Sequence, residues 1–477
     1  MIASSMLAAG HGPIGELLAL ATTSSSEIAA IVFADIALIV VVARVMGALF
    51  RWLRQPAVVG EILAGLLLGP SLLGAFPANL PERLFPLEVR PHLKVIAELG
   101  LIIFMFIIGL QLDTKLLRGK QRVAAVVSLS SVALPFGLGL GLAALLHGAH
   151  GQVDGKAVAF WPFALFIGAS MSVTAFPVLA RILTERGMHQ TELGALVLAC
   201  AAVDDIIAWS LLAVVLAVIA SSGVGHLLFI LAASLAFVAV MFTIVRRGLK
   251  VVADRYRHAG HLTPDLLAVI MAGLLASAFV TSSIGIHSIF GAFIFGTVMP
   301  RDQTDGLFRE VLERLEQVSM LLLLPVFFII TGLDADVRGL GWSGMGELAL
   351  VLLVACAGKF GGAALAARAQ RIRTRKAVAI GVLMNTRGLT ELVILNVGLA
   401  FGVLDRQLFT MLVVMAIFTT VIAGPLLRLL YPDQVLRRDL ARAQRASPGE
   451  DGQNLARPPE RLAAEMLPTD SASGAET

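Results

Sequence analysis

The feature of this sequence that most limits its fold is a series of about thirteen long apolar segments. A helix needs about 20 predominantly apolar residues to cross the hydrocarbon core of a bilayer. We place the segments at residues 28–50, 56–74, 93–112, 123–147, 157–183, 193–221, 226–246, 264–284, 286–300, 317–333, 346–368, 376–399 and 408–430. The chain is 15% charged, whereas soluble domains are about 25% charged. The sequence therefore predicts an all-α polytopic membrane protein.

Lysine and arginine gather in the connections that follow odd-numbered segments. They are Arg51, Arg54, Lys115, Arg118, Lys120, Arg122, Arg186, Arg246, Arg247, Lys250, Arg255, Arg257, Arg301, Arg309, Arg314, Arg371, Arg373, Arg375 and Lys376. The connections after the fourth, sixth and tenth segments carry one such residue or none, and residues 75–92 are mixed. Because cytoplasmic loops are enriched in basic residues, this alternation predicts an amino terminus outside and a carboxyl terminus in the cytoplasm. It requires an odd number of spans: thirteen, or eleven if two segments are re-entrant.

The two ends of the chain differ from the membrane domain at 28–430. Residues 1–27 lack a basic region before an apolar core, so we expect an extracytoplasmic segment rather than a cleaved signal peptide. Residues 431–477 turn polar and are predicted to be a largely disordered cytoplasmic tail. Cys200 and Cys356 lie in apolar runs and indicate packing, not a disulfide. The net charge of +4 follows from the basic loops, so no nucleic-acid partner is predicted, and neither is a cofactor.

Charged residues inside the apolar segments mark a candidate ion site. Asp204 and Asp205 are adjacent in the sixth segment, and Lys359 lies in the eleventh. Each charge costs about 2.5–3.5 kcal/mol at the centre of a membrane helix, so each needs a reason. Adjacent helical residues point about 100° apart and cannot both face one partner. We expect one aspartate to face a water-filled cavity, where it binds a proton or a small cation, and the other to face a neighbouring helix.

A structural alternative explains the same charges. One aspartate forms a buried ion pair with Lys359, and the other is merely tolerated. A pair of this kind needs only one carboxylate, which favours a functional role for the second. Lys359 is then either a structural partner of Asp204 or a group that couples proton and cation binding when the pair breaks.

Two segments contain breaks in matching positions. In the fifth, "GASMSVTAFPVLARIL" places Pro177 well inside the apolar run, after Ser170, Ser172 and Thr174. In the twelfth, the interrupting residues are Asn385, Thr386, Arg387, Gly388 and Glu391. Proline removes a helical hydrogen bond, and a broken helix at membrane depth is tolerated where it lines a cavity or is buried in protein. Paired interruptions predict a binding site between two inverted repeats, segments four to six and eleven to thirteen. The alternative is an ordinary proline kink and a glycine packing contact.

Eight motifs occur in an order that resembles a known family. They are "QPAVVGEILAGLLLGPSLLG" at 55–74, "FMFIIGLQLD" at 104–113, "SVTAFPVLARIL" at 172–183, "AAVDDIIAW" at 201–209, "GIHSIFGAFIFG" at 285–296, "LPVFFIITGLD" at 324–334, "CAGKFGG" at 356–362 and "MNTRGLTEL" at 384–392. Together they resemble the monovalent cation:proton antiporter-2 family over about residues 28–430. That family includes bacterial Na⁺/H⁺ antiporters, potassium-efflux antiporters and plant cation/H⁺ exchangers.

The resemblance implies a homodimer whose protomer has a dimerisation domain, about 28–112 and 264–333, and a core domain, about 123–221 and 346–430. The core would contain two inverted repeats with crossed, discontinuous helices at 172–177 and 385–388. The resemblance makes Asp205 the cation and proton site and Asp204 the partner of Lys359. The Asp–Asp form resembles electrogenic members. The broken-helix motifs resemble plant exchangers, which usually carry Asn–Asp, so electroneutral K⁺/H⁺ exchange is the alternative.

The sequence therefore predicts a secondary antiporter that exchanges Na⁺ or K⁺ for protons in the cell membrane, with the bacterial inner membrane as the expected location. Its partners would be these ions, membrane lipid and a second copy of the chain. An intramembrane aspartyl enzyme is disfavoured, because its two carboxylates must converge from different helices. A receptor would usually add a folded signalling domain. A sodium-coupled solute symporter would need a larger polar cavity.

Overall fold

The computed structural model describes residues 13–53, 55–75, 80–111, 121–188, 191–221, 223–300, 305–432 and 434–439. The predictions for Arg54, Arg301, the basic connection at 112–120 and the chain beyond residue 439 lie outside the described residues. Residues 434–439, which the sequence assigns to a disordered tail, are helical. The folded part of the chain therefore extends further than its polar composition indicates, because this short segment is held by contacts described below.

One group of helices comes from the first quarter and the middle of the chain. Its members are α1 (Pro13–Trp52), α2 (Ala57–Leu68), α3 (Leu80–Leu84), α4 (Arg90–Gln111), α9 (Val224–Val240), α10 (Arg246–Ala259), α11 (Pro264–Ile284), α12 (Ser288–Val298), α13 (Asp305–Val318) and α14 (Leu324–Leu333). π-helical turns at Met241–Val245 and Ser319–Leu323 join α9 to α10 and α13 to α14, and short 3₁₀ turns lie at Leu73–Ala75 and Arg338–Leu340. Helix α14 packs on α2 and α4, and α12 packs on α4 and α11. We refer to this set as the first helix group.

Small residues bring the backbones of the first helix group together. A Cβ atom on Gly332 of α14 would lie 2.0 Å from the backbone of Gly65 in α2. A Cβ atom on Gly109 of α4 would lie 2.1 Å from the carbonyl oxygen of Phe293 in α12. Helices in a membrane associate through such close packing, because lipid offers no hydrophobic driving force between them.

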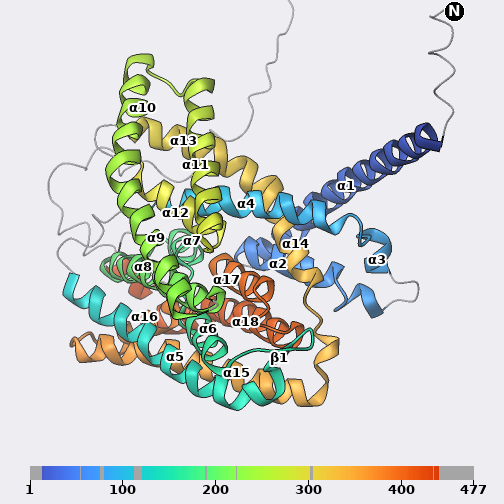
Figure 1. The fold of residues 1–477 in the computed structure, drawn as a ribbon. Helices are drawn as coiled ribbons and strands as arrows, with labels where there is room; N and C mark the ends of the chain where they lie inside the picture. Colours follow the sequence, from blue (N-terminus) through green and yellow to red (C-terminus); the bar gives the residue numbers. More distant parts are fainter. Residues whose placement is uncertain are drawn as a thin grey trace, which may run out of the picture.

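The second helix group comes from the remaining two stretches of the chain. Its members are α5 (Gln121–His150), α6 (Phe160–Ser172), α7 (Phe176–Glu185), α8 (Glu192–Ala220), α15 (Gly341–Ala369), α16 (Thr374–Met384), α17 (Leu389–Ala400) and α18 (Arg406–Leu430). A two-residue antiparallel hairpin, β1 (Gln152–Val153) and β2 (Lys156–Ala157), follows α5 and is the one departure from an all-helical description within the described residues. Helices α5 and α15 pack along each other (Figure 1).

The division into a dimerisation domain and a core domain stays a prediction, and α9 and α10 lie outside the ranges that the sequence analysis assigns to either domain. Each half of the second helix group consists of a helix, a broken helix and a helix: α5, α6–α7 and α8, then α15, α16–α17 and α18. The inverted relation of these halves and the dimerising role of the first helix group stay predictions.

Each of the thirteen apolar segments contains a helix in the structure. In the described part of the chain, nine helices are long and apolar enough to cross a membrane, or ten if the bent pair α16–α17 is one span. One of the nine, Gly306–Ala369, includes both the tenth and the eleventh predicted segments, whereas α2 and α12 are shorter apolar helices. The polytopic, helical character is confirmed, and the number of thirteen crossings stays a prediction.

The outer surface is apolar, as expected of a protein surrounded by lipid. Large side chains such as Phe33, Leu235, Phe279 and Leu365 are about 70% exposed: 71%, 71%, 72% and 68%. A soluble monomer rarely exposes a continuous apolar surface of this kind. Five buried charged residues, Asp204, Asp205, Lys359, Arg387 and Glu391, lie inside the second helix group, where the candidate site lies.

Candidate functional site

Helix α8 carries the adjacent aspartates into the interior of the second helix group. The helix starts at the N-cap residue Thr191, whose hydroxyl accepts a hydrogen bond of 3.0 Å from the Gly194 amide, and Glu192 lies in its first turn. The hydroxyl satisfies a free backbone amide in the first turn, and the negative charge of Glu192 is favourable at the positive end of the helix dipole. Between three and four turns further on, Asp204 and Asp205 are 0% and 1% exposed. Both carboxyl groups are thus removed from bulk water.

The break between α6 and α7 lies just before Pro177. Helix α6 ends at Ser172, the residues Val173 and Ala175 are extended, and α7 begins at Phe176. Pro177 occupies the first turn of α7, where its missing N–H group is not needed for an intrahelical hydrogen bond. The sequence placed the interruption correctly, but the proline starts the second half-helix and does not kink a continuous one.

The second break, at residues 385–388, crosses the first. Helices α16 and α17 are bent by 43° at this point. The Ala175 amide donates a hydrogen bond of 3.1 Å to the carbonyl oxygen of Thr386, so the two linkers touch through their backbones. The Thr174 hydroxyl lies 3.2 Å from the carbonyl oxygen of Met384. The two discontinuous helices therefore meet at one crossing inside the second helix group.

Asp204 is held by three donors at one oxygen. Its Oδ2 atom lies 2.7 Å from the Ser131 hydroxyl, 2.7 Å from the Thr174 hydroxyl and 3.0 Å from Nζ of Lys359. Thr174 has a single hydroxyl hydrogen, and its shorter contact is the one to the carboxylate. Three donors at one oxygen fix the position of the Asp204 side chain, and one of them, the Lys359 ammonium, forms a charge-assisted hydrogen bond.

Lys359 reaches the crossing from α15. Its ammonium group is 0% exposed, pairs with Asp204 and also donates to the carbonyl oxygen of Ser172, the last residue of α6. A buried ammonium is stable only when a carboxylate and further hydrogen bonds replace its water. Lys359 therefore links the Asp204 carboxylate to the carbonyl end of a half-helix, where the helix dipole is negative.

Asp205 lies beside this network but outside it. Within the described part of the chain, neither of its carboxylate oxygens has a hydrogen-bond partner. The nearby Phe176 amide, at the start of α7, interacts with the carboxyl group without completing a hydrogen bond. A buried carboxylate without hydrogen-bond partners is strongly unfavourable in its charged form, which sets Asp205 apart from Asp204.

Arg387 and Glu391 form a second buried ion pair at the crossing. The Arg387 guanidinium lies 2.9 Å from the Glu391 carboxylate, and both side chains are 0% exposed. The same guanidinium donates to the carbonyl oxygens of Ser170 and Met171, at 2.7 Å each. Arg387 thus covers the negative end of α6, while Glu391 lies in the first turn of α17, at its positive end. The pair neutralises two half-helix ends.

The remaining predicted residues contribute mainly through the backbone. The hydroxyls of Ser170 and Ser172 donate to carbonyl oxygens within α6, so these residues present their own carbonyls to the cationic side chains. The Thr386 hydroxyl donates to the carbonyl of Leu383. The Asn385 side chain points away from the buried charges: its amide nitrogen lies 3.8 Å from the Cys356 sulfur, and the residue lines an apolar cavity. Gly388 caps α17.

The site includes residues that the sequence analysis missed. Ser131 binds Asp204, and Ser128, one turn away, donates 2.8 Å to the Cys200 carbonyl in α8. The Thr420 hydroxyl, on α18, contacts both the amide and the carbonyl oxygen of Arg387, at 3.0 and 2.6 Å. The spacing of Ser128 and Ser131 on one face of an apolar helix was the available signal.

Within the described part of the chain, two cavities are lined by residues of both helix groups. The inner cavity, of about 400 Å³, is lined by Arg51 and Gln55 from one group and by Arg186, Thr420 and Arg428 from the other. Basic side chains dominate it, which places it on the predicted cytoplasmic side. Because Thr420 contacts the Arg387 backbone, this cavity approaches the crossing.

The outer cavity, of about 370 Å³, has a different charge. Its polar lining includes Glu98 and Asp334 from the first helix group and Asn396, Asp405 and Arg406 from the second. The inner and outer cavities both follow the boundary between the groups.

Crossed, discontinuous helices beside buried charges are the arrangement expected of a secondary transporter. Residues 37–431 match the family model described as "Sodium/hydrogen exchanger, transmembrane". The chain therefore belongs to the sodium/hydrogen exchanger family, and it is a multi-pass membrane protein.

Similar sequences support this assignment. The chain is 42% identical over 406 residues to the Na⁺/H⁺ antiporter NhaS4 of Synechocystis sp., covering 84% of this chain and 97% of that protein. It is 39% identical to cation/H⁺ antiporter 20 of Arabidopsis thaliana, covering 83% and 48%. It is 36% identical to K⁺/H⁺ antiporter 1 of Saccharomyces cerevisiae, covering 90% and 49%. The chain thus spans about half the length of the plant and yeast relatives.

The fold also matches a solved structure. The sodium proton antiporter MjNhaP1 from Methanocaldococcus jannaschii superposes with a TM-score of 0.63 at 15% identity, covering 87% of this chain and 99% of that chain. At this identity the similarity concerns the fold alone. The predicted family and helical fold are confirmed.

Proposed function

We propose that this chain exchanges Na⁺ or K⁺ for protons across a membrane, and that Asp205 is the site at which the two ions compete. The observation that carries the proposal is the Asp205 carboxylate, which is 1% exposed and has no hydrogen-bond partner among the described residues. A proton or a monovalent cation neutralises it equally well in charge, but the two cannot occupy it together. Mutually exclusive binding at one site is the condition for antiport.

The Asp204–Lys359 pair sets the number of protons exchanged. If Lys359 stays protonated throughout the cycle, one cation replaces one proton at Asp205 and the exchange is electroneutral. If the cation also draws Asp204 away from Lys359, the lysine is left buried without its carboxylate and releases its proton. Two protons then exchange for one cation, and transport is electrogenic. We favour the second scheme, because Lys359 is 0% exposed and Asp204 is its one carboxylate partner among the described residues.

Alternating access requires that the crossing reach each side of the membrane in turn. We propose that the second helix group moves as a unit against the first, which would form the dimer with a second copy of the chain. The inner and outer cavities, both at the boundary between the groups, support this movement. We further propose a bacterial inner membrane location, with the amino terminus outside and the carboxyl terminus in the cytoplasm, because of the basic connections.

The proposal is tested with purified protein in liposomes that contain a pH-sensitive dye. Na⁺ or K⁺ is added outside, and valinomycin with a K⁺ gradient sets the membrane potential in the Na⁺ experiments. We expect wild-type protein to change the internal pH and Asp205→Asn to leave it constant. Asp265→Asn, at an exposed position on α11, is the matched control and should transport normally.

Two further results distinguish the schemes. A transport rate that responds to the imposed potential in wild type, but not in Lys359→Gln, supports two protons per cation. A rate that ignores the potential in both proteins supports electroneutral exchange. Normal transport by Asp205→Asn would contradict the proposed function itself.

A further inference from the structure

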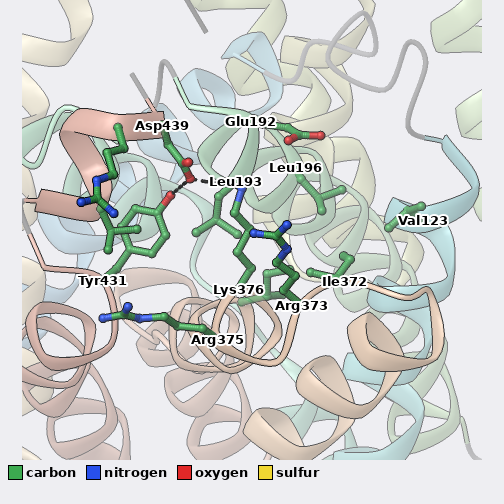
Figure 2. Close-up of a pocket in the computed structure, with 13 residues that line it drawn as sticks. Val123, Glu192, Leu193, Leu196, Ile372, Arg373, Arg375, Lys376, Tyr431 and Asp439 are labelled. Atoms are coloured by element: carbon green, nitrogen blue, oxygen red, sulfur yellow. Dashed lines mark hydrogen bonds and ion pairs between the residues drawn. The ribbon is translucent and has the colours of Figure 1, made fainter. Parts of the chain in front are cut away.

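A cavity of about 580 Å³ lies at one end of the second helix group, away from the crossing. It is formed where α5, α8 and α16 begin and α18 ends, and the short helix at 434–439 completes it. Figure 2 shows side chains from these elements converging around it. The positions of the basic residues place this end of the group on the predicted cytoplasmic side.

One side of the cavity is basic. Arg373, Arg375, Lys376 and Arg438 line it, together with the acidic residues Glu192 and Asp439. Four basic and two acidic side chains leave a net charge of about +2 in this one cavity. The rest of the lining includes the aliphatic side chains Val123, Leu193, Leu196, Ile372, Ile380 and Val435. The cavity is therefore amphipathic.

Internal contacts hold the basic side in shape. Asp439 pairs with Nζ of Lys376 at 3.1 Å and accepts a hydrogen bond from the Tyr431 hydroxyl (Figure 2). Burial, and then the Asp439 carboxylate, raise the pKa of Tyr431, so its hydroxyl stays protonated and remains a donor. Arg375 donates a hydrogen bond of 2.6 Å to the carbonyl of Leu430 at the end of α18. These contacts occupy Lys376 and Arg375, whereas Arg373 and Arg438 are exposed at the rim.

We propose that this cavity binds the phosphate group of an anionic phospholipid, with Arg373 and Arg438 on the phosphate and an acyl chain along the aliphatic wall. Guanidinium groups suit phosphate oxygens, because they donate two parallel hydrogen bonds. Basic pockets between transmembrane helices on the cytoplasmic side have the chemistry of lipid headgroup sites. A soluble phosphate compound shares the phosphate but would leave the half-buried aliphatic side chains Val123, Ile372 and Val435 without an apolar partner, so we assign a lipid.

The cavity is connected to the candidate ion site by two helices. Helix α16 runs from Lys376 to the crossing at Met384, about 12 Å at 1.5 Å per residue. Helix α8 runs from Glu192 to Asp204, about 18 Å by the same rise. A lipid that joins the ends of α8, α16 and the 434–439 helix would therefore restrain the elements that carry the ion site. Binding itself does not depend on the proposed transport activity.

The test uses the delipidated full chain in detergent and follows its thermal unfolding as lipid is added. We expect phosphatidylglycerol to raise the unfolding temperature, while phosphatidylcholine and soluble glycerol phosphate leave it unchanged. In the Arg373→Gln/Arg438→Gln variant, the phosphatidylglycerol concentration that gives half the effect should rise on the order of thirtyfold, since each arginine near an anionic lipid contributes about 1 kcal/mol. The matched control is Arg247→Gln/Arg255→Gln, which removes two exposed arginines from α10.

Four results would overturn the proposal. An equal effect of phosphatidylcholine would show that the arginines do not select the headgroup. An equal effect of glycerol phosphate would mean a soluble phosphate compound is the ligand. An unchanged half-effect concentration in the Arg373→Gln/Arg438→Gln variant, or the same loss in the α10 control, would place the lipid elsewhere. Because unfolding is measured without transport, each result is independent of antiport activity.

Discussion

Replacing Asp204 with asparagine tests how the buried charges at the crossing depend on each other. In wild type, one oxygen of Asp204 accepts from Ser131, Thr174 and Lys359. Asparagine can still accept from the two hydroxyls, but it leaves the Lys359 ammonium buried without its carboxylate. Breaking a buried pair by removing one partner costs about 3–5 kcal/mol. We expect Asp204→Asn to be destabilised by this amount.

The double variant Asp204→Asn/Lys359→Met removes the ammonium as well. Asparagine and methionine leave no unpaired charge at the crossing, so we expect the double variant to regain at least about 2 kcal/mol of the free energy of unfolding that Asp204→Asn loses. The gain is partial because the Ser172 carbonyl loses the Lys359 donor. The assay is thermal unfolding of the purified proteins in detergent, with Asp265→Asn as the exposed control. The predicted order of midpoints is wild type, then the double variant, then Asp204→Asn. If Asp204→Asn unfolds at or above the midpoint of the double variant, the two charges are not coupled and this reasoning is wrong.

Two other substitutions examine the packing and the second ion pair. Gly332→Ala places a methyl group within 2.0 Å of the α2 backbone, so we expect less folded protein on size-exclusion chromatography. The control Gly346→Ala, with open space around the new methyl group, should elute as wild type does. Equal recovery of the two variants would contradict the close contact between α14 and α2. Glu391→Gln leaves the buried Arg387 guanidinium without its carboxylate, so we expect the free energy of unfolding to fall by about 3–5 kcal/mol. An unchanged midpoint of thermal unfolding would show that the carbonyl oxygens of α6 suffice to hold the arginine.

The sequence predicts the charged part of the site because ionised residues are rare in apolar helices. Asp204, Asp205 and Lys359 stand out for this reason, and the structure brings Asp204 and Lys359 together from positions 155 residues apart. The break before Pro177 is also visible in the sequence, because proline cannot continue the hydrogen bonding of a helix. These are local chemical features that need no knowledge of the packing.

The hydroxyl groups that hold the charges are much harder to predict. Serine and threonine in apolar helices commonly bond to a carbonyl in their own helix, as Ser170 does, and such residues have no role at the site through their hydroxyls. Ser131 and Thr420 differ from such residues only because the tertiary packing places the Asp204 carboxylate and the Arg387 backbone beside their hydroxyls. The helix at 434–439 was missed for a related reason, since its polar composition resembles a tail and its order depends on the contact between Asp439 and Lys376.

The central claim is that a cation and a proton compete for Asp205, and proton release from the purified protein tests it most directly. Na⁺ or K⁺ is added to wild-type protein in weakly buffered detergent solution while a dye or electrode records pH, with choline chloride as the ionic-strength control. The account predicts that at least one of the two cations releases protons from wild type and that neither releases them from Asp205→Asn. Equal proton release from Asp205→Asn would show that the exchange site is another group.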